Sequence, residues 1–221
     1  MLEGKISSLK KEIIEYGSLA EKMIEKSIKG ILKRDNNVLT EVIENDEPKA
    51  NRLEIEIDEH CTTCIAQFEP KARNLRTILM ILKISNDLER IADHAVNIAE
   101  SGLFLVENIP VKPLIDIPRM AELSTAMLKD SITSLINEDS LLARDVCERD
   151  NTVDALKEQI LRELITFMSS DPNTIARAMH LIRISSNLER IADLSTNICE
   201  DVIFMVEGKN IKHHQQDGKT I

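Results

Sequence analysis

The sequence predicts an all-α fold of two tandem three-helix bundles, and three observations lead to this prediction. Residues 84–107 and 184–207 repeat at an offset of 100 and are identical at 14 of 24 positions, which indicates an internal duplication. Each copy contains three long segments in which apolar residues recur every three or four positions, as in amphipathic helices. With six Gly, six Pro, one Tyr and no Trp in 221 residues, the chain also lacks the turn and aromatic residues of a β-sandwich or barrel.

The helices are expected in two similar units. The first unit is expected to span residues 1–108 and the second 109–208, with a polar and frayed tail at 209–221. Short connections between long helices favour antiparallel neighbours, so each unit should be a three-helix bundle. The two bundles should pack side by side, related by a pseudo-two-fold axis. The expected helices are 3–33, 37–67 and 72–106 in the first unit, and 114–136, 140–168 and 172–207 in the second.

Apolar spacing and helix breakers define these segments. The first segment has one apolar stripe, formed by Ile6, Leu9, Ile13, Tyr16, Ala20, Met23, Ile24, Ile28 and Ile31. Asn36 with Asn37, Pro70, the stretch 107–113 and Asp171 with Pro172 separate the helices. Pro48 lies inside the second segment, where it lacks an N–H and its ring would clash with the preceding turn. We therefore expect a kink or a helix restart at 46–48.

Charge and hydropathy exclude several classes of protein. Lys and Arg total 28 against 38 Asp and Glu, and a net charge of −10 disfavours binding to nucleic acid. No run of about 18 apolar residues is present, so no transmembrane helix is expected. The N-terminal residues lack the apolar segment of a secretory signal, and we expect a cytoplasmic protein.

The four cysteines are expected to be reduced and structural. Cys61 and Cys64 form a CxxC pair, but at an offset of 103 they fall opposite Leu164 and Phe167, which are apolar positions. A tetrahedral zinc site would need a second such pair. Cys147 and Cys199 are each expected to be isolated, small apolar residues.

The third helix of each unit carries a stripe of oxygen-bearing side chains opposite its apolar stripe. On a helical wheel the stripe is predicted to face away from the bundle core. A solvated acidic surface is the common fate of such a stripe, and it remains an alternative. The stripe consists of Asn86, Glu89, Asp93, Asn97 and Glu100 in the first unit and of Ser186, Glu189, Asp193, Asn197 and Glu200 in the second.

Paired acids at a four-residue spacing favour a metal-binding role for these stripes. Like charges at i and i+4 destabilise a helix by a few tenths of a kcal/mol, so a counter-ion is expected where they recur. Four such pairs occur, two in each unit, if an amide is accepted in one of them. Oxygen-only ligand sets favour hard cations. The pairs are Glu47 with Asn51, Glu89 with Asp93, Asp150 with Asp154, and Glu189 with Asp193.

One histidine and two arginines near the stripe are not expected to be metal ligands. His94 lies five residues after Glu89 and has Leu194 as its counterpart, which does not fit the Glu-x-x-His spacing of di-iron bundles. Arg90 and Arg190 lie at the edge of the stripe, where each could pair with a carboxylate. Phosphate binding is the alternative for these two arginines.

The doubled LERIAD segments, each followed by N-I-x-E, together with the acid-x-x-x-acid pairs and tandem three-helix units, resemble the PhoU family of phosphate-uptake regulators over residues 5–210. The resemblance implies metal binding, often as multinuclear iron clusters, with Mn, Mg, Zn, Ni or Ca as alternatives. Its motif positions are the four pairs above. Asn97, Glu100, Asn197 and Glu200 extend the stripe and are further candidates. Asn51 replaces an acid, so the first-unit site is expected to bind fewer ions, or bind them less tightly.

The resemblance further implies a regulator rather than an enzyme. It implies negative regulation of an ABC phosphate transporter, through its ATPase subunit, and of a sensor histidine kinase, with homodimers as the expected assembly. Two alternatives stay open from the residues: a helical adaptor that needs no metal, and a metal-dependent hydrolase. The hydrolase would need an open coordination position beside a cleft with a general base.

Overall fold

The computed structural model describes residues 2–208 and is all-helical over that range. The polar tail that the sequence predicts to be frayed, residues 209–221, lies outside the described residues. The elements are α1 (Leu2–Lys33), α2 (Asn36–Glu41), the π-helical turn η1 (Val42–Asp46), α3 (Glu47–Phe68), α4 (Arg73–Glu107), α5 (Asp116–Asn137), α6 (Ser140–Ser170), the 3₁₀ turn η2 (Pro172–Thr174) and α7 (Ile175–Glu207).

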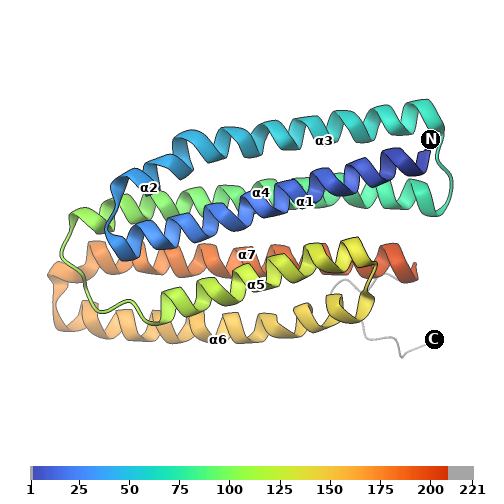
Figure 1. Ribbon diagram of the computed structural model, residues 1–221. Helices are drawn as coiled ribbons and strands as arrows, with labels where there is room; N and C mark the ends of the chain where they lie inside the picture. The colour runs from blue at the N-terminus through green and yellow to red at the C-terminus, as the bar shows by residue number, and fades with distance from the viewer. Residues whose placement is uncertain (1, 209–221) are drawn as a thin grey trace, which may run out of the picture.

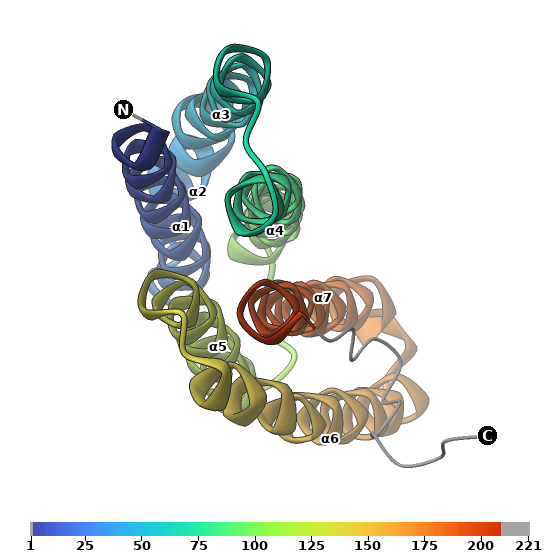
Figure 2. The same ribbon diagram turned by 90° about the vertical axis from the view of Figure 1, so that its right-hand side faces the viewer.

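Six long helices form two layers, as Figure 2 shows in a view along their axes. The helices α3, α1, α5 and α6 form a curved outer layer, and α4 and α7 lie side by side within its curve. In Figure 1, α4 runs antiparallel to α7, and α1 runs antiparallel to α5. This is the arrangement expected of two bundles related by a pseudo-two-fold axis. The linker between the bundles follows the end of α4 at Glu107.

A continuous apolar core joins the two bundles. The apolar stripes of α1, α4, α5 and α7 are buried, with Ile13, Ile24, Ile84 and Leu188 each 0% exposed. Polar contacts cross the same interface: Lys83 on α4 binds Asp201 on α7, and the ring Nδ1–H of His94 donates a hydrogen bond of 2.8 Å to the amide oxygen of Asn187. His94 therefore faces the other bundle, consistent with the prediction that it is not a metal ligand.

Equivalent caps begin the second helical segment of each unit. The carboxylate of Asp35 accepts hydrogen bonds from the amides of residues 37 and 38, and that of Asp139 accepts them from residues 141 and 142. Such side chains satisfy amides that lack a partner in the first helical turn. The caps have a sequence offset of 104, which places the two copies in register at this point.

The helix restart predicted at 46–48 is present, and the structure gives its cause. The offset between copies falls from 104 at Asp35 to 103 at Leu53, so the first copy has one extra residue in between. The π-helical turn η1 accommodates it, as π-turns accommodate single insertions in α-helices. Pro48 follows in the first turn of α3, where its missing N–H costs no hydrogen bond. The second copy has one uninterrupted helix, α6.

Residues 2–208 contain no helix with the length and apolar character that crossing a bilayer requires.

Candidate metal-binding faces

Two helix pairs carry the predicted acidic side chains, α3 with α4 and α6 with α7. We call the first group the first acidic face and the second group the second acidic face. The first acidic face comprises Glu47, Asn51, Glu54 and Asp58 on α3 with Glu89 and Asp93 on α4. The second acidic face comprises Asp150 and Asp154 on α6 with Glu189 and Asp193 on α7.

The acids of the first acidic face act on each other across the two helices. The negative charges of Glu54 and Glu47 act on Glu89, and the charge of Glu47 acts on Asp93. Asn51 donates a hydrogen bond of 2.8 Å to Glu47, which ties the motif pair of α3 together. The structure thus brings the predicted α3 and α4 pairs to one place.

Burial and mutual repulsion raise the pKa of the carboxyl groups on this face. Desolvation is the largest cause for Glu54, Asp58, Glu89 and Asp93, and neighbouring carboxylates raise the pKa of Glu54, Glu89 and Asp93 further. No Lys or Arg in residues 2–208 lies within salt-bridge distance of these four groups or of Glu47. Such groups gain most from a nearby cation, which favours their charged form.

Glu54 and Asp58 were not among the residues predicted from the sequence. They lie seven and eleven residues after Glu47, which places them on the same side of α3 as Glu47 and Asn51. This helical spacing is the sequence signal that could have identified them. The search for pairs shared by both copies passed over them, because their counterparts are Lys157 and Leu161. With these two acids the first acidic face has five carboxylates, so the amide at Asn51 does not leave it with less charge than the four carboxylates of the second.

The second acidic face carries its own cations. Lys157 donates a hydrogen bond of 2.9 Å to Glu189, and Arg190 donates one of 3.1 Å to Asp193. The pKa of Asp193 is still raised, first by desolvation and then by Glu189, while Arg190 opposes the shift. Arg190 therefore balances local charge, as predicted, and Arg90 does so through Asp87 at 3.5 Å.

The acidic stripes face outward in part: Asp93 and Glu100 are exposed as predicted, whereas the motif glutamates are more covered. Glu89 and Glu189 are half-buried, and the Glu189 side chain is only 13% exposed. The antiparallel neighbours α3 and α6 cover one side of each stripe, which a helical wheel of a single helix cannot show. The extensions lie one or two turns further along α4 and α7 than the acid pairs, and no hydrogen bond among residues 2–208 joins them to those pairs: Asn97, Glu100, Asn197 and Glu200.

Among residues 2–208, no three His, Cys, Asp or Glu side chains are already arranged around one point as a metal site. The donor chemistry nevertheless fits hard cations, because every group on the first acidic face offers oxygen.

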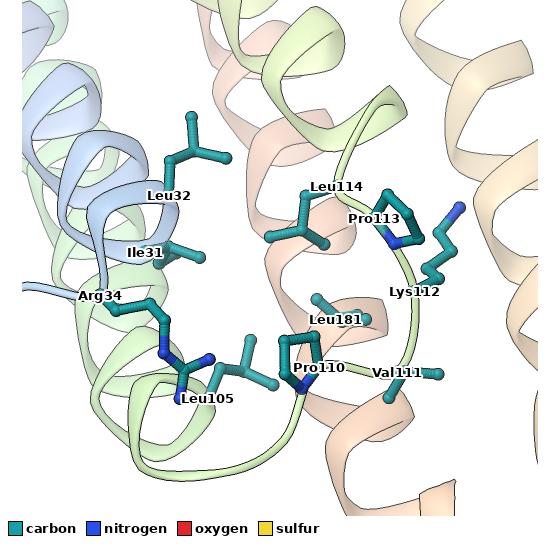
Figure 3. Close-up of a pocket in the computed structure, with 10 residues that line it drawn as sticks. All are labelled: Ile31, Leu32, Arg34, Leu105, Pro110, Val111, Lys112, Pro113, Leu114 and Leu181. Atoms are coloured by element: carbon teal, nitrogen blue, oxygen red, sulfur yellow. The ribbon is translucent and has the colours of Figure 1, made fainter.

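The cavities lie elsewhere. A cavity of 210 Å³ lies at one end of the molecule, where the linker between the bundles meets α1, α4 and α7 (Figure 3). Leu105, Pro110, Leu114 and Leu181 line it together with Arg34. None of its lining residues belongs to either acidic face.

The cysteines are reduced thiols in the packed interior. Cys61, Cys64 and Cys199 are buried, and burial raises the pKa of Cys61 to about 12. The apolar environment expected for the CxxC pair is confirmed. Cys199 is buried, as expected, whereas Cys147 is half-buried and its thiol donates a hydrogen bond to the carbonyl oxygen of Thr196 at 4.0 Å.

Comparison with known proteins places this architecture in context. Residues 13–102 and 117–202 each match the PhoU domain. The chain is 40% identical over 208 residues, 94% of either chain, to the "Phosphate-specific transport system accessory protein PhoU homolog" of Aquifex aeolicus. It is 34% identical over 217 residues to a second such homolog from Thermotoga maritima, covering 98% of this chain and 92% of the relative.

Solved structures have the same fold. The crystal structure of PhoU from Pseudomonas aeruginosa superposes with a TM-score of 0.91 at 30% identity, covering 95% of this chain and 100% of that one. The phosphate transport system regulatory protein PhoU from Streptococcus pneumoniae gives a TM-score of 0.88 at 22% identity, covering 96% of this chain and 100% of that one.

Proposed function

Because the chain belongs to the PhoU family, we propose that it is a cytoplasmic, non-enzymatic accessory protein that regulates phosphate uptake and binds multivalent metal ions at its acidic faces. The phosphate role is supported by the names of relatives that match nearly the whole chain. We further propose that it restrains an ABC phosphate transporter, through the ATPase subunit, and a sensor histidine kinase. A homodimer is the proposed assembly.

The observation that carries the metal proposal is the uncompensated charge of the first acidic face. Five carboxylates from α3 and α4 share this face without a salt bridge among residues 2–208. Burial raises the pKa of four of them, Glu54, Asp58, Glu89 and Asp93, and neighbouring carboxylates raise the pKa of Glu54, Glu89 and Asp93 further. A bound cation would offset that repulsion. Iron, as a multinuclear cluster, is the proposed occupant, because several carboxylates spread over two helices can bridge more than one ion.

Metal binding would connect the faces to the stability of the fold. Any ligand that binds only the folded chain stabilises it by RT ln(1 + [L]/Kd). The ligands lie on α3 and α4, or on α6 and α7, so bound ions would hold the outer and inner layers of each bundle together. In this way metal content would set the rigidity of the surface that meets a partner.

Elemental analysis tests this proposal. The wild type is compared with a variant in which Glu89 and Glu189 become Gln and Asp93 and Asp193 become Asn, both purified without chelator or histidine tag. We expect several metal ions per chain in the wild type and their loss in the variant, with helicity unchanged by circular dichroism. A control variant removes four exposed carboxylates that belong to neither face and should keep its metal: Glu3, Glu15, Glu25 and Glu56.

Metal-free wild type that takes up no ions on titration would contradict the metal proposal. The regulatory role has a separate test, in a bacterium that lacks its own PhoU relative and over-expresses its phosphate-starvation genes. We expect the wild-type chain to restore repression in phosphate-rich medium. If the four-site variant represses equally well, the chain is the metal-independent adaptor instead.

A further inference from the structure

The single tyrosine of the chain occupies an unusual position in the first bundle. Tyr16 on α1 is 0% exposed, and its hydroxyl oxygen has no hydrogen-bond partner among residues 2–208. A buried polar group without a partner costs about 1–3 kcal/mol. A phenylalanine would fill the same volume without that cost, so the hydroxyl needs an explanation.

The charges of the first acidic face act on this hydroxyl. Burial is the largest cause that raises the pKa of Tyr16, followed by the negative charges of Glu54, Glu89, Asp93 and Asp58. These four acids come from α3 and α4, the two helices of the same bundle against which α1 packs. The phenol thus lies on the core side of the first acidic face, and the largest charge effects on it all come from acids of that face.

The second bundle provides an internal control for this position. At the offset of 104 that relates α1 to α5, the counterpart of Tyr16 is Met120, which is also 0% exposed. The packing of the bundle therefore accepts a residue that has no hydroxyl. The acids nearest to the phenol also differ between the copies, because Lys157 and Leu161 replace Glu54 and Asp58. The hydroxyl and the extra acids occur together, in one bundle only.

We propose that Tyr16 is a metal ligand of the first acidic face, binding ferric iron as a phenolate beside Glu54, Asp58, Glu89 and Asp93. This inference rests on the proposed metal binding and adds a ligand from the core side of the face. On binding, the phenol O–H bond breaks, its proton passes to a neighbouring carboxylate or to water, and the oxygen lone pair forms the bond to iron. No electron is transferred in this step.

The consequence is a difference in metal preference between the faces. A phenolate and five carboxylates form a hard and strongly anionic donor set, which suits a trivalent cation. The second acidic face has four carboxylates, two of them paired with Lys157 and Arg190, and no phenol. It should accept divalent ions at most weakly and should not form a coloured ferric site.

Visible absorption of iron-loaded protein tests the assignment. Ferric phenolates absorb visible light through charge transfer from oxygen to iron, and with one tyrosine in the chain such a band can only come from Tyr16. The wild type and Tyr16→Phe are loaded with ferric citrate, freed of excess citrate and compared by absorption and elemental analysis. We expect bound iron in both, and a charge-transfer band in the wild type that Tyr16→Phe abolishes.

A matched control moves the tyrosine to the other bundle. The double variant Tyr16→Phe/Met120→Tyr keeps one buried tyrosine but places it beside Lys157 instead of Glu54, and we expect it to remain colourless. A band in this variant would contradict the requirement for uncompensated acids. Tyr16→Phe removes only an unpartnered hydroxyl, so it should fold with a midpoint of thermal unfolding at least as high as that of the wild type.

The outcomes separate the two proposals. Iron bound by the wild type without a charge-transfer band overturns the role of Tyr16 and leaves metal binding in place. A band that persists in Tyr16→Phe also overturns it, because the absorption then has another source. Failure of the wild type to bind iron overturns both.

Discussion

The two acidic faces descend from one duplicated motif but differ in their charge balance. The first acidic face has five carboxylates and no salt bridge, whereas Lys157 and Arg190 partly neutralise the second. A single pair of equivalent positions accounts for much of the contrast, since Glu54 in one copy is Lys157 in the other. Duplicated motifs therefore identify where a site can form, and residues outside the motif decide how strongly it binds.

Reversing the charge at position 54 should remove most of the contrast. Glu54→Lys places a cation where the second bundle has Lys157, and we expect it to pair with Glu89. At an effective dielectric constant of about 20, one charge several ångströms away contributes about 2–4 kcal/mol, so affinity for Mn²⁺ should fall about 30-fold or more. Isothermal titration measures the change.

The control for Glu54→Lys is Glu56→Lys, which makes the same charge change on the exposed side of α3, in the groove against α1. It should reduce affinity only slightly, because exposed charges are screened by solvent and salt. Equal losses in the two variants would show that overall charge, and not the first acidic face, governs binding.

The reciprocal substitution should strengthen the second acidic face. Lys157→Glu removes the partner of Glu189 and adds a carboxylate at the position of Glu54. We expect about tenfold tighter Mn²⁺ binding at this face, a smaller effect than in the first because Arg190 still contacts Asp193. Titration in a background with Glu89→Gln and Asp93→Asn isolates the second acidic face. Unchanged Mn²⁺ affinity in that background would contradict the claim that Lys157 weakens binding at this face.

The pH dependence of stability should differ between the faces in the metal-free protein. Folded-state pKa values of Glu54, Asp58, Glu89 and Asp93 lie above their unfolded values, so the folded state binds more protons and gains stability as pH falls through these values. Their facing groups are Glu47, Arg90 and His94. At a pH above these pKa values the four groups are charged, and the repulsion between them is fully present.

Urea unfolding at about pH 7 and about pH 5 measures this dependence against a Glu54→Gln/Asp58→Asn variant. We expect the variant to be more stable than the wild type by about 0.5 kcal/mol at the higher pH, with the difference shrinking at the lower pH. A variant that is less stable at neutral pH would show that these acids stabilise the metal-free fold.

Restoring the motif acid should have the smallest effect. Asn51→Asp completes the acid pair on α3 but replaces the hydrogen bond that Asn51 donates to Glu47 with repulsion. We expect the metal-free protein to lose a few tenths of a kcal/mol and Mn²⁺ affinity to rise about threefold. Thermal unfolding with and without Mn²⁺ reports both changes, and a drop in affinity would contradict the ligand role of this position.

Most of the fold was predictable because it depends on local periodicity. The six helices and the restart near Pro48 follow from apolar spacing and from the chemistry of proline. The π-helical turn was not predicted, although the repeat offset already contained the extra residue that η1 accommodates. A change of offset can reflect a longer loop or an extra residue within a helix, and only the structure distinguishes the two.

The candidate site was predictable only in part. Motif pairs such as Glu89 with Asp93 follow from i and i+4 spacing within one helix. The salt bridge between Lys157 and Glu189 depends on the register of α6 against α7, which no single helix encodes. Tyr16 fits an apolar stripe in the sequence, and only the structure shows that its hydroxyl lies unpartnered beside the acids.

Anomalous diffraction from crystals grown with limiting Mn²⁺, at no more than one ion per chain, tests the difference between the faces most directly. The account predicts an anomalous peak between α3 and α4, near Glu54, Glu89 and Asp93, before any appears between α6 and α7. Equal peaks at both faces, or a stronger peak beside Lys157, would contradict it.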